Sequence, residues 1–599
     1  MCGIFGYKGN KDTGALLVEG ITKLDYRGYD SAGFATLDKG KIHVEKGVGK
    51  MKEISKKINV KKLKGKIGIA HTRWSTHGKV TLENSHPHMS CDGKIALVHN
   101  GIIDNYQVLK ERLLKKGHTF TSETDTEVIV HLIEDEMKKV KDFKKSVIKA
   151  LEQLKGMYAL VIIHQDYDGM IVVRRGSPLL VGLGEKEFFV SSDVISFLPY
   201  TNKAFVIDDN ELASITTKVE VENIVEGKKV KKKIQKFNIK GIQSGLGNFQ
   251  HFMLKEIYEQ PETLRKTYAK ISSQLKQLHL KPFNRVVTVA CGTAYYATLT
   301  GSYFFEKFLR LPVDVEYASE FRYKNPVIDD KTLVIAVSQS GETADTLEAV
   351  REAKKKGAFI VSICNVAHST MVRESDFTFH TQAGVEIGVA STKAFTSQLL
   401  TLLLFALYFA KFKDEHNREQ LVMYTNELLG LSDTIKKVLS GFSDIEKIAA
   451  KFTHYKHALF LGRGFLYPIA LEGALKLKEI SYIHAEGQSA AELKHGPIAL
   501  IDKDMPCIFI ALKDKLYEKV LINMEEVKAR GGKIIAIATE GDTEIKKFAD
   551  EVIYIPHVSE EVSPLLAIIP LQLFAYFVAL RKGCDIDKPR NLAKVVTVE

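Results

Sequence analysis

The second half of the chain contains a weak internal repeat, which constrains the possible folds more than any other feature. Each copy begins with an apolar run, a glycine turn and a helical stretch: Arg285–Ala290 with Cys291-Gly292-Thr293, and His457–Leu461 with Gly462-Arg463-Gly464. Each copy then continues through a second run and a helix to a third run: Thr332–Val337 to Phe359–Cys364, and Pro506–Leu512 to Lys533–Ala538. Strand–helix–strand alternation is typical of parallel sheets. The repeat therefore predicts two tandem doubly wound α/β domains.

The first 225 residues have a different texture. Two helical patterns, near Gly14–Leu24 and Thr126–Met137, interrupt a series of short β-like runs, which favours an α+β domain with antiparallel sheets. The runs are Lys66–Ala70, Ile95–His99, Ala159–His164, Met170–Arg174 and Phe188–Ser191. The lysine-rich residues 226–240, followed by Gly241 to Gly247, look like a connector. We therefore expect domains at 1–225, 251–440 and 441–585, a linker at 226–250 and a tail at 586–599.

The composition limits the classes of protein to which the chain can belong. A chain of 599 residues with 45% hydrophobic and 26% charged residues is typical of a soluble globular protein of three or four domains. Its six cysteines are far apart and form no CxxC pair, which indicates a reducing, cytoplasmic location and argues against disulfides or a structural zinc site. No signal peptide is apparent. The apolar stretch from Leu565 to Leu580 contains Pro570 and Gln572, so we expect a buried helix there and no membrane span.

The net charge of +12 raises the question of a nucleic-acid partner. The lysines, however, lie in patches such as Lys61–Lys66 and Lys228–Lys236, mixed with acidic residues. No aromatic-interleaved basic motif of an RNA- or DNA-binding module accompanies them. A solvated, lysine-rich surface is therefore the better interpretation.

A cysteine stands at position 2, followed by Gly3-Ile4-Phe5-Gly6. If the initiator methionine is removed, Cys2 carries both a thiol and a free α-amino group, and the amine can act as general base for the thiol. Alternatively, Cys2 is an ordinary buried thiol that packs as a small hydrophobic side chain. The other motifs of the first domain favour the nucleophile.

Those motifs form one constellation. They are Tyr26-Arg27-Gly28-Tyr29-Asp30-Ser31, His71-Thr72-Arg73-Trp74-Ser75-Thr76-His77-Gly78, His99-Asn100-Gly101 and Ser122-Glu123-Thr124-Asp125-Thr126-Glu127. Together with Cys2 they resemble the N-terminal-nucleophile (Ntn) glutamine amidotransferases of class II. The resemblance implies an αββα glutaminase domain that releases ammonia from L-glutamine.

The resemblance also implies a role for each glutamine-site residue. Thiolate attack on a carboxamide builds an oxyanion, for which Asn100 and Gly101 are the implied donors. Arg73 suits the carboxylate of free glutamine and Asp125 its ammonium group, while Trp74, Thr76 and His77 complete the implied pocket. Taken alone, Arg73 could be a surface ion pair and Asn100-Gly101 a hairpin turn.

A second constellation lies in the first repeat. Hydroxyl groups of Ser338-Gln339-Ser340-Gly341-Glu342-Thr343 follow a buried strand and precede a helix, where backbone N–H groups can cradle a phosphate. A plain Ser/Thr helix cap explains the same spacing. With Val389-Ala390-Ser391-Thr392-Lys393 and the turn at Cys291–Thr293, the loop resembles that of sugar isomerase (SIS) domains, which bind phosphosugars. The implied sugar-phosphate residues are Thr293, Ser338, Gln339, Ser340, Thr343, Val389, Ser391, Lys476 and Ala593.

Two departures qualify this second resemblance. The second repeat has Leu512-Lys513-Asp514-Lys515 where the first has its serine-rich loop, so the first copy is expected to supply most of the phosphate site. Ala294 stands where bacterial relatives commonly have serine, so that position is left out of the site.

A third constellation combines the helix around Glu472, Lys476 and Glu479 with His495 and Lys594. The three helix residues share one face, a pattern that an ordinary ion-paired helix also gives. Over its whole length the chain resembles amidotransferases that carry the amide nitrogen of glutamine to D-fructose 6-phosphate and give glucosamine 6-phosphate for amino sugar biosynthesis. The resemblance implies that His495 opens the sugar ring, Lys594 forms a Schiff base and Glu479 moves the proton between C1 and C2.

The same resemblance implies a homodimer, no metal or organic cofactor, no nucleic-acid or membrane partner, and an ammonia channel gated by Trp74. Three alternatives are weighed against it. A phosphoribosyl amidotransferase would need an acidic diphosphate-binding loop, and none is found. A sugar-amine deglycase would not need the glutaminase domain. A non-catalytic sugar-phosphate sensor would need no N-terminal nucleophile, and no DNA-binding module is visible.

Overall fold

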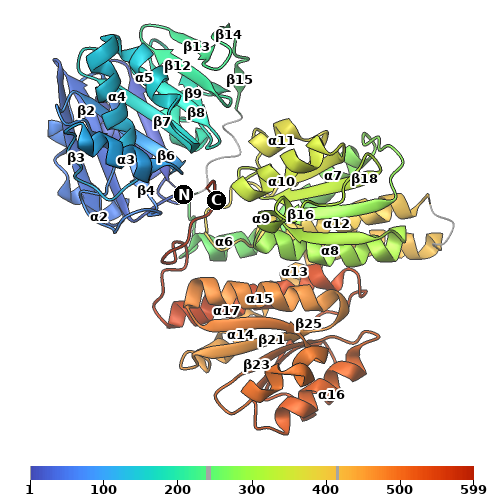
Figure 1. Cartoon of the computed structure of the whole chain (residues 1–599). Helices are drawn as coiled ribbons and strands as arrows, with labels where there is room; N and C mark the ends of the chain where they lie inside the picture. The colour runs from blue at the N-terminus through green and yellow to red at the C-terminus, as the bar shows by residue number, and fades with distance from the viewer. Residues whose placement is uncertain (1, 238–244, 413–416, 599) are drawn as a thin grey trace. The chain divides into compact units, whose positions relative to one another are not determined.

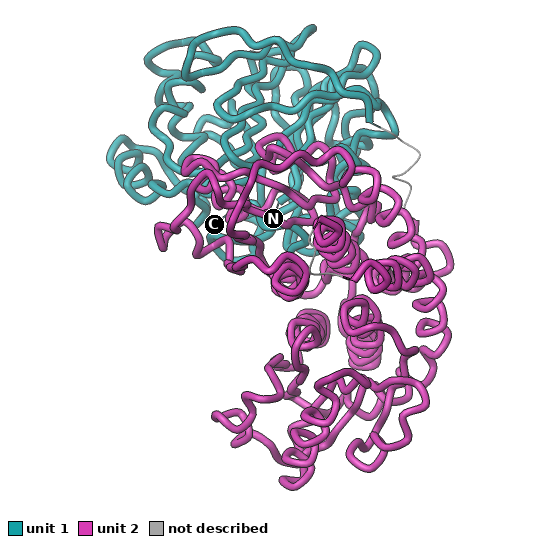
Figure 2. Tube along the Cα trace, turned by 90° about the vertical axis from the view of Figure 1, so that its right-hand side faces the viewer, with its two compact units in different colours: residues 1–243, 593–599 teal, residues 244–592 magenta. Residues whose placement is uncertain are grey.

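The computed structural model describes residues 2–237, 245–412 and 417–598, which form two compact units (Figures 1 and 2). The first unit consists of Met1–Gln243 together with the C-terminal Ala593–Glu599, and the second of Ser244–Leu592. The last residues of the chain therefore belong with the first domain, although the segment before them belongs with the second unit.

Two antiparallel sheets form the centre of the first unit. The eight-stranded sheet has the order β15 (Gln235–Lys236), β11 (Lys203–Val206), β9 (Leu180–Leu183), β10 (Phe188–Ser191), β1 (Gly3–Lys8), β4 (Ile67–Arg73), β2 (Ser31–Asp38) and β3 (Lys41–Val48). The seven-stranded sheet has the order β14 (Lys228–Val230), β13 (Val219–Asn223), β12 (Glu211–Ile215), β8 (Met170–Arg175), β7 (Gly156–His164), β6 (Ile95–Ile103) and β5 (His88–Met89).

Three hydrophobic layers hold this unit together. One joins the two sheets, with Ile4 and Ile69 from the first facing Ala96 and Val161 from the second. A second layer packs helices α1 (Thr13–Thr22) and α2 (Met51–Lys57) on the eight-stranded sheet. The third packs α3 (Tyr106–Lys115), α4 (Glu127–Val140) and α5 (Phe143–Leu151) on the seven-stranded sheet. The expected αββα arrangement is confirmed.

The segment expected to be a linker from residue 226 differs from that expectation. Strand β14 pairs with β13, and β15 pairs with β11, so both extend the sheets of the first unit. Each is an edge strand, and lysines on edge strands discourage further pairing. Lysine-rich edge strands have the composition of a linker, which is why the sequence suggested one.

The second unit contains two five-stranded parallel sheets with the same strand order. The first has the order β17 (Val313–Tyr317), β16 (Arg285–Ala290), β18 (Thr332–Ser338), β19 (Phe359–Cys364) and β20 (Phe377–His380). The second has the order β22 (His484–Ser489), β21 (His457–Gly462), β23 (Cys507–Ala511), β24 (Ile534–Thr539) and β25 (Glu551–Ile555). The predicted duplication of a doubly wound domain is confirmed.

One continuous core joins the two repeats. The repeats' helices include α8 (Thr293–Leu309), α10 (Ala344–Lys355), α12 (Lys393–Ala410), α15 (Tyr467–Ser481), α16 (Tyr517–Lys528) and α17 (Ser563–Arg581); α6 (Phe252–Tyr258), α7 (Gln260–Leu275), α13 (Arg418–Ser440) and α14 (Phe442–Ala450) flank them. By length and composition, α12 and α17 are apolar enough to cross a membrane, but they are 89% and 94% buried inside the unit. A helix that is apolar on all sides belongs in a core, so the buried helix expected at 565–580 is confirmed.

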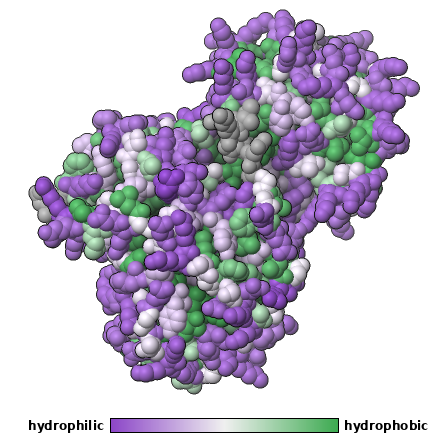
Figure 3. All heavy atoms as spheres, turned by 180° about the vertical axis from the view of Figure 1, so that it is seen from behind, coloured by the Kyte–Doolittle hydropathy of each residue, from purple (hydrophilic) through white to green (hydrophobic). Residues whose placement is uncertain are grey.

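The lysine patches are largely exposed, and hydrophilic residues predominate on the face drawn in Figure 3. Several of these lysines lie beside carboxylates, with Lys229 at 3.6 Å from Glu220 and Lys232 at 2.7 Å from Glu211. The positive charge is therefore distributed among ion pairs on a solvated surface.

Candidate active sites

Cys2 immediately precedes β1, which lies between β10 and β4 in the eight-stranded sheet. In the register of these strands Gly3 faces Thr72, so the end of β4 and the following Trp74 come next to Cys2. The Trp74 N–H donates to Cys2 Sγ at 3.3 Å, and the thiol lies 3.6 Å from the Trp74 carbonyl oxygen. Burial raises the pKa of the Cys2 thiol, although the Trp74 N–H and the Arg73 charge partly oppose that rise. The thiol therefore needs a base to become a nucleophile.

Asn100 lies beside Cys2, and Gly101 follows it within β6. The Asn100 Nδ2 donates to the carbonyl oxygen of Cys2 at 3.1 Å, and Asn100 itself is buried. Gly101 has a φ of +137°, and a Cβ there would come within 2.0 Å of the Met157 carbonyl oxygen. Only glycine can take this position, so the direction of the backbone at residue 101 is fixed by the fold.

The orientation of Asn100 depends on His71, a residue that the sequence motif contained but to which it assigned no role. His71 Nε2 lies 2.9 Å from the His99 carbonyl oxygen and 3.1 Å from Asn100 Oδ1. Both neighbours are acceptors, so Nε2 carries the hydrogen and donates to them. Burial lowers the pKa of His71 to about 3, which keeps the ring neutral. This arrangement leaves the amide nitrogen of Asn100 pointing toward Cys2.

Arg73 is buried at the end of β4, and its own loop closes around it. Its guanidinium donates to the carbonyl oxygens of His77, Gly78 and Lys79, the last at 3.1 Å. Burial lowers the pKa of Arg73, while the nearby Cys2, Asp30 and Asp125 raise it. The structure therefore brings Arg73 into the electrostatic neighbourhood of both Cys2 and Asp125.

The remaining glutamine-site predictions lie around the same loop. The carboxylate of the buried Asp125 accepts the Ile103 N–H at 2.8 Å. Thr76 is exposed, and its hydroxyl lies 3.3 Å from His77 Nδ1. The His77 ring meets Tyr106 edge-on, with centroids 5.3 Å apart. Thr76 is therefore exposed and His77 half-buried, whereas Asp125 is buried.

Two further residues support Cys2 and were missed as site residues. The buried Arg27 donates from Nε to the Cys2 carbonyl oxygen at 3.4 Å. Asp30 accepts the Ser75 N–H at 2.8 Å, and the backbone N–H of Asp30 donates to the Arg73 carbonyl oxygen at 3.0 Å. The motif Tyr26–Ser31 was the available signal, because it places both residues between β1 and β2.

In the second unit, the loops after β16 and β18 meet where the strand order reverses. Ligands of open α/β sheets bind at this switch point. The Ser338 hydroxyl accepts the Gly341 N–H at 3.0 Å, and that of Ser340 accepts the Glu342 N–H at 3.2 Å. Thr343 precedes α10, but its side chain makes no capping hydrogen bond. Its hydroxyl lies 3.4 Å from Ser338 Oγ instead.

Among the other predicted sugar-phosphate residues, Gln339 makes a backbone contact, whereas Val389 and Ser391 lie on a second loop. The Gln339 carbonyl oxygen accepts the Asn365 N–H at 3.3 Å. The Val389 N–H donates to the Asp587 carbonyl oxygen at 3.1 Å, and Ser391 Oγ donates to Glu386 at 2.9 Å. The buried Glu386, which sequence reasoning missed, also accepts the N–H groups of Thr392 and Ala394 and so holds the loop around Ser391 in place.

Helix α15 of the second repeat brings a charged cluster to the first repeat. Lys476 Nζ donates to Thr293 Oγ1 at 2.9 Å and lies 3.2 Å from Glu472 and 2.7 Å from Glu479. Burial lowers the pKa of Lys476, but the two carboxylates outweigh it and the net pKa is raised. Burial raises the pKa of Glu472 to about 7 against the opposing effect of Lys476. Glu472, which was left out of the predicted site, lies 3.2 Å from the Thr293 hydroxyl.

The three remaining predicted residues are His495, Ala593 and Lys594. His495 is exposed at the end of the 3-10 turn Ala490–His495, and within the described ranges its imidazole has no hydrogen-bond or ion-pair partner. Ala593 and Lys594 are half-buried and belong to the first unit, whereas Lys476 and Glu479 belong to the second. One group with the chemistry to hold a metal ion, Cys91, His118, His131 and Glu134, shares no residue with the predicted sites.

Comparisons with known proteins agree with this two-part organisation. The family model described as a glutamine amidotransferase domain matches residues 56–243, and the SIS domain model matches residues 279–408 and 451–581. The chain is 49% identical over 603 residues to glutamine–fructose-6-phosphate aminotransferase [isomerizing] of Aquifex aeolicus, and 47% identical over 620 residues to the protein of that name from Chlorobaculum tepidum. All of this chain and all of each relative are covered.

Among solved structures, the C-terminal domain of glucosamine-fructose-6-phosphate aminotransferase from Francisella tularensis is 44% identical, with a TM-score of 0.54. It covers 58% of this chain and 100% of that structure. The fold and the family matches define the class of enzyme: a glutamine amidotransferase domain followed by two sugar isomerase domains. More narrowly, the full-length relatives show that the chain belongs to the family of glutamine–fructose-6-phosphate aminotransferases.

Proposed function

We propose that this protein transfers the amide nitrogen of L-glutamine to D-fructose 6-phosphate, giving D-glucosamine 6-phosphate and L-glutamate. The observation that carries the proposal is the half-buried thiol of Cys2, which accepts the Trp74 N–H and lies near the Arg73 charge, while the Asn100 amide donates to the carbonyl oxygen of Cys2. A thiol, an oriented amide donor and a buried cation are what attack on the side chain of free glutamine requires.

In the glutaminase reaction, Cys2 Sγ attacks the side-chain carbonyl carbon of glutamine. Its proton passes to the α-amino group that becomes free when the initiator methionine is removed. Asn100 Nδ2 and the Gly101 N–H stabilise the oxyanion, and the amine returns the proton to the departing ammonia. Water then hydrolyses the thioester to glutamate. Arg73 holds the α-carboxylate of glutamine, Asp125 holds its ammonium group, and Trp74, Thr76 and His77 close the pocket.

In the sugar reaction, the phosphate binds at the Ser338–Thr343 loop, with Val389, Ser391 and Ala593 at its rim. His495 opens the ring, and Lys594 condenses with the C2 carbonyl to form an imine with loss of water. Ammonia displaces the lysine from that imine. Glu479 then moves a proton from C1 to C2, which converts the C2 imine and C1 hydroxyl into a C2 amine and C1 aldehyde. Lys476 and Thr293 hold Glu479 and the substrate in place.

The test follows the nitrogen atom. Purified protein is incubated with fructose 6-phosphate and glutamine labelled with nitrogen-15 at the amide, and the sugar product is analysed by mass spectrometry. We expect labelled glucosamine 6-phosphate in equal amount to glutamate. Cys2→Ala is expected to abolish both, since loss of a nucleophile costs many orders of magnitude in rate. Cys584→Ser, a half-buried thiol in the second unit, is the matched control. Label remaining as free ammonia in the wild type would contradict the proposal.

We further propose a homodimer in the cytoplasm, without a nucleic-acid or membrane partner. All six cysteines are free thiols, which suits a reducing compartment. The exposed His495 is available to a second copy of the chain. Light scattering on the purified protein gives the oligomeric state, and intact mass shows whether the initiator methionine is removed.

A further inference from the structure

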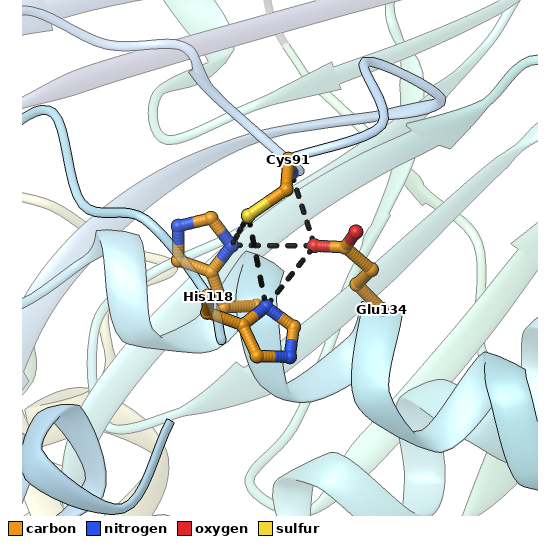
Figure 4. Close-up of side chains that lie close together, drawn as sticks. Cys91, His118 and Glu134 are labelled. Carbon is orange, nitrogen blue, oxygen red and sulfur yellow. Dashed lines mark hydrogen bonds and ion pairs between the residues drawn. The ribbon is translucent and has the colours of Figure 1, made fainter. Parts of the chain in front are cut away.

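We infer that Cys91, His118, His131 and Glu134 form a tetrahedral metal site in the first unit, and that its ion is zinc. Each of the four residues offers one potential ligand atom, and these atoms all lie within 4.8 Å of one another. Figure 4 shows the labelled side chains of Cys91, His118 and Glu134 close together. Three of the four residues are buried, and Cys91 is exposed, which gives an ion a path of entry. Four protein ligands would leave no open position, as in structural zinc sites.

The distances between the ligand atoms favour a metal over a hydrogen-bonded cluster. Cys91 Sγ lies 3.7 Å from His118 Nδ1 and 3.5 Å from His131 Nδ1. Glu134 Oε2 lies 3.3 Å from His118 Nδ1 and 3.4 Å from His131 Nδ1. With zinc–sulfur bonds of about 2.3 Å and zinc–nitrogen and zinc–oxygen bonds of about 2.0 Å, the edges of a tetrahedron are about 3.6 Å and about 3.3 Å. Hydrogen bonds from nitrogen to oxygen are usually shorter, about 2.7–3.2 Å.

The groups around the cluster fit an outer shell of such a site. His131 turns its other ring nitrogen toward Glu127, at 3.5 Å, which resembles the carboxylate–histidine pairs that orient metal ligands. The Thr119 N–H donates to Cys91 Sγ at 3.5 Å, and the Cys91 N–H donates to Glu134 Oε2 at 3.0 Å. Both ligand atoms that would carry negative charge, the thiolate and the carboxylate, thus receive backbone N–H groups.

The ligands come from three separate pieces of the first unit. Cys91 lies in the turn between β5 and β6, His118 follows α3, and His131 and Glu134 lie one turn apart on α4. Residues three apart on a helix share a face, which is why both can reach the ion. The choice of zinc rests on the ligand set: one thiolate, two imidazoles and one carboxylate in a tetrahedron suit zinc better than magnesium or calcium.

An ion at this site would be bound by residues on both sides of the segment 119–126 in the sequence. His118 lies directly before this segment, and α4 begins directly after it. Glu127, which faces the ligand His131, also accepts the N–H groups of Thr121 and Ser122. The metal ion would therefore hold the segment that carries Asp125 in its folded position.

The test measures metal in the full-length, untagged protein purified from zinc-supplemented cells. We expect about one zinc per chain by elemental analysis, and at least a tenfold lower content in both Cys91→Ser and His131→Gln. Cys584→Ser and His43→Gln are matched controls, since both native residues are half-buried and lie outside the cluster. Replacement of zinc by cobalt should give a tetrahedral absorption spectrum with a thiolate-to-cobalt band that is absent in Cys91→Ser.

Circular dichroism confirms that the variants are folded, and Glu134→Gln provides a third, milder change of the ligand set. Wild-type protein without stoichiometric zinc, even after incubation with a tenfold excess and gel filtration, would overturn the inference. So would loss of zinc from Cys2→Ser with retention in Cys91→Ser, because the ion would then lie at the nucleophile.

Discussion

Asn100 donates its side-chain amide to the backbone carbonyl oxygen of Cys2 over 3.1 Å. The residue proposed to stabilise the oxyanion therefore also holds the peptide group that carries the nucleophile. His71 fixes the other end of the same amide through Asn100 Oδ1. This pre-orientation matters because donors that are already aligned need no reorganisation when charge develops.

We expect Asn100→Ala to lower the kcat for glutamine hydrolysis about 10²–10³-fold, the usual cost of removing one oxyanion donor. The KM for glutamine should change little, because the donor acts mainly in the transition state. Asn105→Ala is the control: Asn105 bonds Gln153 and Lys155 near the same strand, away from Cys2. Equal losses in the two variants would mean that Asn100 is structural.

Ser340→Ala should raise the KM for fructose 6-phosphate without changing basal glutamine hydrolysis. Loss of a hydrogen bond to a charged phosphate costs roughly 1.5–3 kcal/mol, which corresponds to about 10–150-fold in affinity. Steady-state kinetics at varied sugar phosphate provide the measurement. Ser375→Ala, which removes a hydroxyl that donates to the carbonyl oxygen of Met371 in the same repeat, should leave this KM unchanged. An unaltered KM in Ser340→Ala would exclude that hydroxyl from the phosphate site.

Glu472→Gln should stabilise the protein more at pH 8 than at pH 5.5. The buried carboxyl has a pKa of about 7 in the fold against 4.5 in its ordinary state. Between these values the folded state binds more protons than the unfolded state, so the stability contributed by this group falls as pH rises and is lost above pH 7.

Calorimetric melting temperatures of the wild type and of Glu472→Gln at the two pH values check this sign. Glu492→Gln, at an exposed position in the same repeat, serves as the control. A variant that is less stable than the wild type at pH 8 would show that Glu472 is needed in its charged form to hold Lys476.

Borohydride added in the presence of fructose 6-phosphate should label Lys594, because reduction traps the proposed imine. Lys594→Arg should remove both the label and the synthesis of glucosamine 6-phosphate, while glutamine hydrolysis persists. Lys588→Arg changes a half-buried lysine of the same tail and should keep the label. Peptide mapping identifies the modified residue, and a label on any other lysine would exclude the role given to Lys594.

The fold was largely predictable because its signals are local. Strands such as β16 and β19 were predicted with the bounds that the structure has, since apolar runs between turns define them directly. The edge strands β14 and β15 were not predicted, because lysines on a sheet edge look like lysines in a linker. The duplication of one doubly wound domain was predicted from the shared pattern, and the structure adds that both copies have the same strand order.

The candidate sites were predictable only where a motif carried the chemistry. Cys2, Asn100 and Ser340 stand in such motifs, whereas the part played by His71 depends on which acceptors its ring meets in space. The cluster at Cys91 escaped notice because the expectation of no zinc site rested on cysteine spacing alone. Its other ligands are two histidines and a glutamate, and the nearest of them is His118, far along the chain.

The two repeats of the second unit share one fold but hold different parts of the chemistry. The first keeps the serine-rich loop at its switch point, while the second has Leu512–Lys515 there and offers the side of α15, through Lys476, to Thr293 of its twin. A duplicated domain can in this way enclose one small substrate asymmetrically, with each copy presenting a different surface. A shift of α15 would move Glu472, Lys476 and Glu479 relative to Thr293, so a substitution in the packing between the two repeats could change this cluster without replacing any of its members.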